Sequence, residues 1–127
     1  MRLHYSSVHQ GYVNSFNQNL ENVNRVLEGG DPKEIKELSQ AIKYCGGGHI
    51  NYEFFWDSLA PMYEGGGVAP SYSSELGKSI NKSFGSFENF VSKFSEKISK
   101  LDGSSWSWLA YNKQTGNLEI KTTKNHG

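Results

Sequence analysis

Apolar residues follow helical spacing through the first half of the chain. Between Leu3 and Leu27 they recur every three or four positions, the stripe of an amphipathic helix, and Gly29–Gly30 ends the pattern. Asp31–Pro32 then supplies a cap and a proline at the first position of a second helix. We expect the glycine run 46–48 to end that helix, and a third, aromatic helix to cover 51–59.

The second half changes from helical to alternating spacing. After a glycine- and proline-containing loop at 62–72, the pattern predicts helices at about 74–84 and 87–101, with Gly85–Ser86 as turn and cap. Apolar and polar residues then alternate on both sides of the turn at 112–116, which is typical of an antiparallel β-hairpin.

These elements predict an α+β fold in two parts. An N-terminal helical hairpin domain is expected at 1–62. An α/β part with two helices and a β-hairpin is expected at 63–127, with the loop between them as the boundary. Because a lone hairpin is marginally stable, it needs a third strand or a covering helix, and we interpret it as part of an incomplete sheet.

Composition excludes some classes of function. The chain has 127 residues, with 13 basic and 13 acidic side chains and no block of like charge, which gives no electrostatic case for nucleic acid as a partner. No apolar run is long enough to span a membrane. Cys45 is the single cysteine. It therefore cannot form an internal disulfide, and this fits an intracellular reducing compartment.

The most informative stretch is Gly46–Trp56, which reads Gly-Gly-Gly-His-Ile-Asn-Tyr-Glu-Phe-Phe-Trp. It resembles the signature of iron/manganese superoxide dismutases, Gly-Gly-Gly-His-x-Asn-His-x-x-Phe-Trp, in which the second histidine binds the metal. In this chain Tyr52 occupies that position. The resemblance therefore predicts the dismutase fold together with a substitution at a metal ligand.

Further motifs follow in the order that the resemblance implies. His4 is similar to the family's first metal ligand, and Tyr12, eight residues later, to its gateway tyrosine. Phe84–Phe87 matches the connection between two helices, and Gly103–Leu109 matches a Gly-Ser-Gly-Trp-Gly-Trp-Leu strand. The resemblance implies that three aromatic side chains line the metal pocket: Trp56, Trp106 and Trp108.

The family's chemistry alternates a manganese or iron ion between two oxidation states, using three histidines and one aspartate. This chain offers His4, with Tyr52 at the second position. A phenolate can bind ferric iron, but tyrosine is longer than histidine and would overshoot a pocket shaped for imidazole. The Asp-x-Trp-Glu-His motif that carries the other ligands is absent from the sequence. We therefore expect no bound cofactor, or manganese or iron if the protein is active.

The remaining histidines have less specific interpretations. His9 stands five residues after His4, so on an α-helix it would face another way, as a structural or exposed residue. His49 belongs to the glycine segment. His126 falls where manganese-type members carry a glutamine that hydrogen-bonds the metal-bound water, and it could act there, although solvation near a chain end is the simpler interpretation. A pocket histidine of the family is replaced by Val8.

Two hypotheses follow. The ligand losses favour a superoxide-dismutase-like protein without dismutase activity. It would be a structural subunit of a larger mitochondrial assembly, such as a mitoribosome or a respiratory complex, or a partner of a homologous chain. Alternatively, the chain is a fragment of an active manganese/iron superoxide dismutase that converts superoxide to dioxygen and hydrogen peroxide. Both hypotheses place it in the mitochondrial matrix, as the family suggests.

Overall fold

The computed structural model describes all residues from 1 to 127, in two units. The first unit comprises Met1–Leu59 together with His126–Gly127, and the second comprises Ala60–Asn125. Helices alone build the first unit, whereas the second combines helices with a β-hairpin. The expected fold class, a helical hairpin domain followed by an α/β part, is confirmed.

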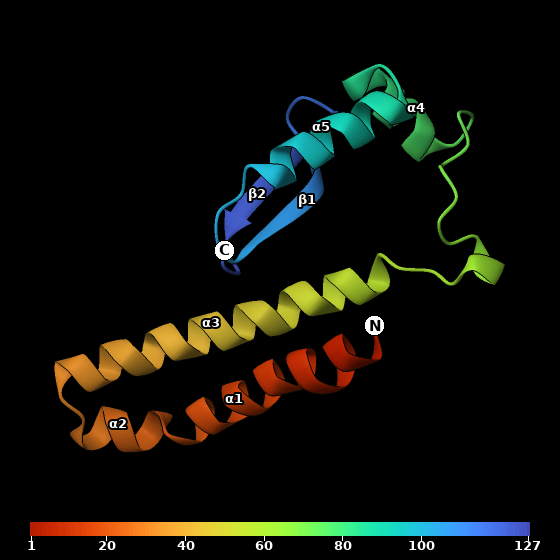
Figure 1. Cartoon of the computed structure of the whole chain (residues 1–127). Coiled ribbons are helices and arrows are strands. Elements are labelled where there is room, and N and C mark those ends of the chain that lie inside the picture. Colours follow the sequence, from red (N-terminus) through yellow and green to blue (C-terminus); the bar gives the residue numbers. More distant parts are fainter. The chain divides into compact units, whose positions relative to one another are not determined.

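The first unit is an antiparallel helical hairpin, in which α1 and α3 lie side by side (Figure 1). It begins with a π-helix, η1 (His4–His9), which continues directly into α1 (Gln10–Glu21). A short α2 (Val23–Gly29) leads to the long α3 (Pro32–Asp57). The single helix expected between Leu3 and Leu27 is therefore three consecutive segments.

Asn22 marks the break between α1 and α2. Its side-chain Nδ2 donates to the Gln18 carbonyl at 3.0 Å, and its backbone amide donates to the Asn19 carbonyl at 3.3 Å. Short polar side chains that bond nearby backbone groups compete with the helical ladder, and this competition is consistent with the interruption. The apolar stripe continues across Asn22, so periodicity alone did not reveal the break.

The start of α3 is confirmed at the residues that the sequence indicated. Asp31 is the N-cap, its Oδ1 accepts a hydrogen bond from the Glu34 amide at 2.8 Å, and Pro32 occupies the first turn. This satisfies one of the amides that a helix leaves unpaired at its N-terminus. The negative Glu34 in the same turn also suits the positive end of the helix dipole.

The glycine run does not end a helix, which corrects the sequence expectation. Residues Gly46, Gly47 and Gly48 lie inside α3, where the chain continues helically to Asp57. A Cβ added at Gly46 would lie 2.9 Å from Phe16, and one at Gly48 would lie 2.7 Å from Tyr12. The glycines therefore serve the close approach of α1 to α3, and not a turn.

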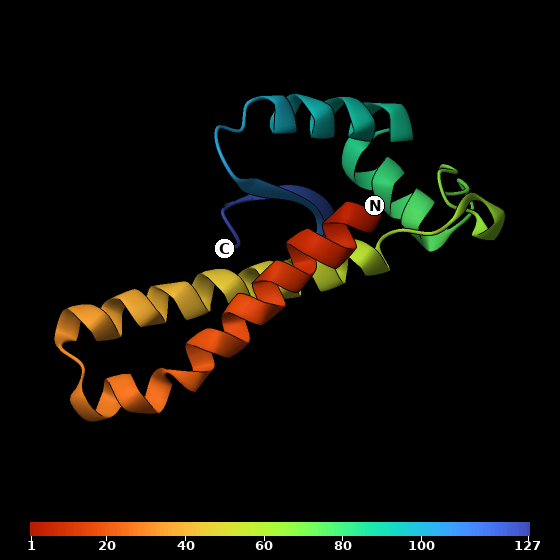
Figure 2. The same cartoon turned by 60° about the horizontal axis from the view of Figure 1, so that its bottom comes forward.

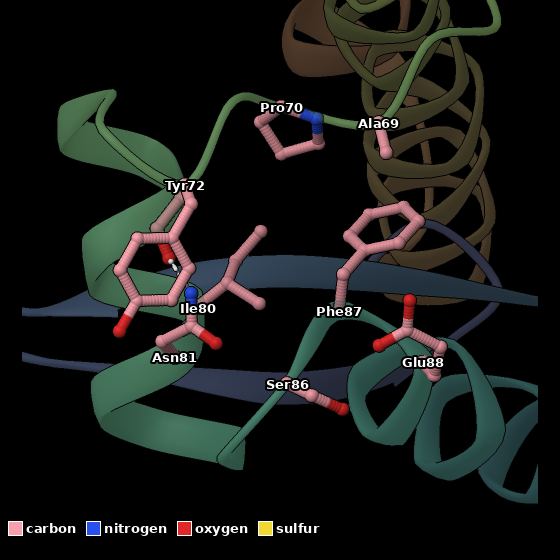
Figure 3. Close-up of a pocket in the computed structure, with 9 residues that line it drawn as sticks. Ala69, Pro70, Tyr72, Ile80, Asn81, Ser86, Phe87 and Glu88 are labelled. Atoms are coloured by element: carbon pink, nitrogen blue, oxygen red, sulfur yellow. Dashed lines mark hydrogen bonds between the residues drawn. The ribbon is translucent and has the colours of Figure 1, made fainter.

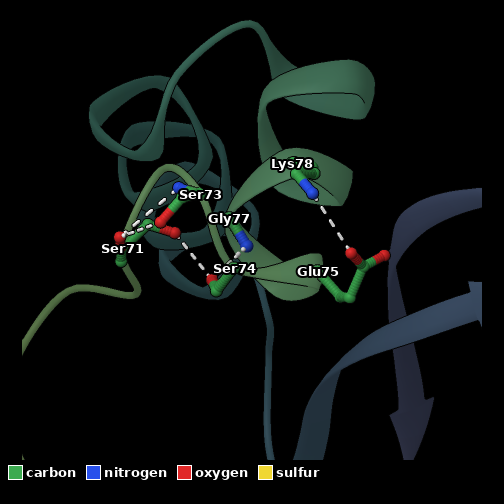
Figure 4. A network of polar contacts seen from close by, with 6 residues as sticks. All are labelled: Ser71, Ser73, Ser74, Glu75, Gly77 and Lys78. Atoms are coloured by element: carbon green, nitrogen blue, oxygen red, sulfur yellow. Dashed lines mark hydrogen bonds and ion pairs between the residues drawn. The ribbon is translucent and has the colours of Figure 1, made fainter.

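The second unit opens with a loop that holds a short 3₁₀-helix, η2 (Met62–Glu64), and continues into α4 (Glu75–Phe84). Ser74 caps α4, because its Oγ accepts from the Gly77 amide at 3.0 Å and donates to the Ser71 carbonyl at 2.6 Å. Figure 4 shows this network with the ion pair between Lys78 and Glu75 one turn along. The loop before α4 is thus fixed by hydrogen bonds to the helix cap.

A tight connection joins α4 to α5 (Phe87–Ser99), as predicted (Figure 2). Gly85 has φ +87°, a left-handed conformation that glycine adopts without strain. Ser86 is the N-cap of α5, with its Oγ accepting from the Asn89 amide at 3.0 Å. Gly85 therefore reverses the chain and Ser86 starts the next helix.

The β-hairpin comprises β1 (Ser105–Asn112) and β2 (Asn117–Lys124), paired antiparallel from Ser105↔Lys124 to Asn112↔Asn117. Helix α4 packs against β2, where the Leu118 amide donates to Ser83 Oγ at 2.8 Å. From α5, Lys97 Nζ donates to the Ile120 carbonyl at 2.6 Å. The hairpin thus has the helical support that a two-stranded sheet needs.

Few apolar side chains are deeply buried. Val26 and Ile80 are each 2% exposed, and Cys45 is 9% exposed. Many large apolar side chains remain open to solvent, among them Leu3, Tyr5 and Phe54. None of the helices combines the length and the hydropathy that a membrane span requires.

Candidate functional site

Four of the residues singled out in the sequence gather in the first unit. Tyr12 comes from α1, Tyr52 and Trp56 come from α3, and His126 follows β2. The ring centroids of Tyr12 and Tyr52 lie 6.0 Å apart, those of Tyr52 and Trp56 lie 5.9 Å apart, and those of Tyr12 and His126 lie 4.9 Å apart. His4, by contrast, is exposed on η1.

Trp106 and Trp108 belong to the second unit, on β1. Being two residues apart on one strand, they point to the same face of the sheet. Their rings stack with centroids 5.4 Å apart and an interplanar angle of 14°. They form a stacked aromatic pair, and their role as pocket residues stays a prediction.

His9 also belongs to this cluster, as a structural residue, while His4 on the same helix is exposed. The Trp56 indole Nε1 donates to His9 Nδ1 at 2.9 Å, and the His9 ring stacks on Tyr52 at 5.5 Å. His9 shares a helix face with Tyr5, four residues earlier, whose ring contacts both His9 and Trp56. The π-helix at 4–9 was not among the elements expected from the sequence.

A defined hydrogen-bond chain runs through His9. An indole nitrogen can only donate, so His9 Nδ1 must accept, and a neutral His9 then carries its proton on Nε2. That nitrogen lies 2.8 Å from His49 Nδ1, and His49 Nε2 lies 3.8 Å from a Glu53 carboxylate oxygen. The chain Trp56–His9–His49 therefore has a single consistent direction, from the indole toward the exposed Glu53.

Tyr12 packs against two other aromatic rings. Its ring meets that of Tyr44 at 5.8 Å and that of His126 at 4.9 Å, and the Tyr44 and His126 rings meet at 4.7 Å. Asn51 Nδ2 also donates to the His126 carbonyl at 3.3 Å. His126 is therefore part of the packed cluster and is not simply solvated, which corrects the simpler interpretation from the sequence.

The electrostatic environment of the cluster favours neutral groups. Burial, with a hydrogen bond to Tyr44, raises the pKa of Tyr12 to about 12, and burial also raises the pKa of Tyr52. Burial lowers the pKa of His9, with a further decrease from the neighbouring His49, and burial lowers the pKa of His126. The charged form of each side chain loses solvation there.

These pKa shifts predict a pH-dependent stability. In the unfolded chain His9 and His126 titrate near the ordinary value of 6.5, whereas in the fold they titrate lower. The unfolded state then binds more protons in the window below 6.5, so the free energy of unfolding is expected to fall as the pH drops through that window. Urea denaturation at a series of pH values measures this slope.

Two variants test the origin of that slope. His9→Phe keeps an aromatic ring against Tyr52 but removes one titrating group, so the slope is expected to decrease. His4→Gln alters an exposed histidine on the same helix and serves as the matched control. The explanation is wrong if the slope is unchanged in His9→Phe or if stability rises as the pH falls.

The residues present do not by themselves fit a redox metal ion. No three histidine, cysteine, aspartate or glutamate side chains gather into a group that could hold one. Of the ligands that the family resemblance implies, His4 is exposed, while Tyr52 lies among the rings of His9, Tyr12 and Trp56. A partly buried phenol whose pKa is raised is a poorer ligand than an imidazole, because it must lose its proton first. We therefore derive no reaction step through a metal.

The second unit holds a separate hollow of about 370 Å³ (Figure 3). Tyr72, Ile80 and Phe87 supply its apolar wall, and Asn81 and Glu88 its polar side chains. None of the residues predicted to carry chemistry lines it. It is therefore distinct from the aromatic and histidine cluster of the first unit.

The two parts of the chain match the two domains of one protein family. Residues 1–60 match iron/manganese superoxide dismutases, alpha-hairpin domain, and residues 72–127 match iron/manganese superoxide dismutases, C-terminal domain. A helical hairpin followed by an α/β part is the class of protein that the fold defines. The chain belongs to the iron/manganese superoxide dismutase family.

Similar proteins include manganese enzymes from plants and bacteria. The chain is 43% identical to a mitochondrial manganese superoxide dismutase of Oryza sativa subsp. japonica and 41% identical to one of Arabidopsis thaliana. Each match covers 98% of this chain and 53% of the relative. A manganese superoxide dismutase of Chlamydia trachomatis is 39% identical, with 98% of this chain and 60% of that relative covered. The chain thus spans about half the length of the plant relatives.

Proposed function

We propose that this chain is part of a superoxide dismutase of the manganese or iron type, which converts superoxide to dioxygen and hydrogen peroxide. The observation that carries the proposal is the identity of 39–43% over nearly the whole chain to relatives named manganese superoxide dismutases. The cluster in which Tyr12 contacts His126 and Tyr52, and Tyr52 contacts Trp56, supports it. The family resemblance predicts these residues to surround the metal.

Within this proposal, the chain's own residues would act around the metal site. His4 is the family ligand that the chain keeps, and manganese or iron would supply the one-electron chemistry when bound. Tyr12 and His126 would form part of the wall of the site, since their rings are in contact and Tyr44 also packs against Tyr12. An active protein would need further ligands from outside this chain, for example from a homologous chain.

A second candidate function is a dismutase-like subunit without activity. Tyr52 favours it, because a tyrosine stands where the family signature has a ligand histidine and its phenol is packed against His9 and Trp56. Such a protein would serve as a structural partner of a homologous chain or of a larger assembly. Under both candidates we propose a mitochondrial location, on the basis of the names of the plant relatives.

The decisive measurement is the metal content of the protein purified from its source, with a superoxide dismutation assay on the same sample. Nearly stoichiometric manganese or iron, with activity in proportion to the metal, would support the enzyme. Absence of metal and activity, in protein that co-purifies with a larger particle, would support the second candidate.

Restoring the ligand histidine gives a related prediction. Tyr52→His in the 127-residue chain is expected to leave metal content substoichiometric and dismutation at the level of free metal. The reason is that one added imidazole does not complete a ligand set. Tyr52→Phe is the matched control, because it keeps the ring but removes the phenol oxygen. Activity that scales with bound metal in Tyr52→His alone would contradict this description of the site.

A further inference from the structure

We propose that Trp56 is a one-electron redox site, that His9 takes its indole proton, and that the oxidising equivalent leaves the cluster through Tyr5 at the surface. The proposal concerns the aromatic side chains of the first unit alone. It requires no metal and holds under either candidate function.

The proton acceptor is already in place at Trp56. Removing one electron from an indole makes its N–H group strongly acidic, so a nearby base determines how easily the electron can leave. The Trp56 Nε1–H group donates to His9 Nδ1 at 2.9 Å, and the two rings stack with centroids 6.4 Å apart. On its other side His9 is hydrogen-bonded to His49 at 2.8 Å, and this bond keeps Nδ1 directed at the indole.

Tyr5 is the residue through which the oxidising equivalent reaches the protein surface. Its ring lies edge-on to Trp56 with centroids 5.6 Å apart, within the range of direct aromatic contact. Tyr5 is 64% exposed. A tyrosine gives up an electron readily only when its phenol proton can leave, and water can take the proton of Tyr5.

The alternative electron donors to the Trp56 radical are two tyrosines deeper in the cluster. Tyr52 lies 5.9 Å from Trp56, and Tyr12 lies 6.0 Å beyond it, but both phenols are partly buried among other rings. Each is less exposed than Tyr5, which is 64% exposed. Contact distances are similar in the two directions, so the difference in solvent access decides in favour of Tyr5.

Azidyl radical serves as the one-electron oxidant. Azidyl takes one electron from Trp56 and becomes azide, while the indole proton passes to His9 and leaves a neutral Trp56 radical beside an imidazolium. Tyr5 then gives one electron to Trp56, the proton on His9 returns to the indole nitrogen, and the Tyr5 phenol proton goes to water. The net products are azide, a Tyr5 phenoxyl radical and one proton in solution.

Pulse radiolysis of the purified protein in azide solution saturated with nitrous oxide tests the proposal, because azidyl radicals oxidise tryptophan in preference to tyrosine. Tryptophanyl absorption is expected to decay as phenoxyl absorption grows, with a first-order rate independent of protein concentration. Trp56→Phe is expected to remove the fast phase of this conversion. Any signal that remains then belongs to Trp106 and Trp108.

Tyr5→Phe is the central variant, because it changes an exposed ring by one hydroxyl group and should leave the fold intact. It is expected to abolish the fast phase, leaving a long-lived tryptophanyl radical. Tyr63→Phe, at a side chain 87% exposed in the other unit, is the matched control and should behave as the unaltered chain. A fast phase that persists in Tyr5→Phe would overturn the proposal, as would a rate that rises with protein concentration.

Discussion

Replacing Ile80 by alanine is expected to lower the free energy of unfolding by about 2–5 kcal/mol. Ile80 is 2% exposed within α4, at the wall of the hollow in the second unit. Removing its outer methyl and methylene groups loses their burial and leaves a cavity that the surrounding helices fill only in part. Because so few apolar side chains of this protein are deeply buried, one such loss is a large fraction of the total stability.

Urea denaturation followed by circular dichroism measures this effect, with an unchanged slope against denaturant as evidence of the same transition. Leu76→Ala is the matched control, because Leu76 lies one turn earlier on the same helix and is 49% exposed. It is expected to cost about 1 kcal/mol or less, in proportion to the smaller area withdrawn from water. Equal losses in the two variants would show that Ile80 is not a core residue.

Gly48→Ala is expected to destabilise the protein by about 1–3 kcal/mol, although alanine is the better helix former. A Cβ at Gly48 would lie between 2.7 and 2.9 Å from three atoms of the Tyr12 ring, and the nearest of these are close to the root of the side chain. The Tyr12 ring is held by Tyr44 and His126, so it cannot swing away. Overpacking therefore outweighs the gain in helix propensity.

The same change from glycine to alanine at Gly11 is expected to have the opposite effect on stability. Gly11 is helical, and a Cβ there meets nothing within 4 Å. Alanine is expected to stabilise the protein by about 0.5–1 kcal/mol, by reducing the freedom of the unfolded chain. Thermal unfolding of both variants tests the pair. An increase in stability in Gly48→Ala would mean that α1 and α3 can separate at no cost.

Local signals determined most of the secondary structure. The Asp31–Pro32 start of α3, the Ser86 cap of α5 and the turn of the β-hairpin each depend on residues adjacent in sequence. Capping side chains and alternating polarity act over a few residues, so their effect could be predicted without the fold. The same is true of the family motifs, which are short runs at fixed intervals.

The candidate site was less predictable, because contacts between distant residues define it. Sequence spacing placed Tyr12 and Trp56 correctly within helices and separated His9 from the face of His4, but it named no partner for His9. The hydrogen bonds from Trp56 to His9 and from His9 to His49 exist only because η1 and α3 meet. Periodicity along one helix identifies a face, but it does not identify the side chains of another helix that meet that face.

The glycine run 46–48 shows most directly which features the sequence determined and which the tertiary structure determined. From the sequence, Gly46–Gly48 had the local signature of a break, because glycine weakens a helix wherever nothing else acts. In the fold, α3 continues through these residues, because the absence of side chains lets the rings of Tyr12 and Phe16 lie against the helix. The sequence by itself determined the family, the order of elements and the caps. Only the tertiary structure decided which residues meet, since close packing between helices depends on atoms far apart along the chain.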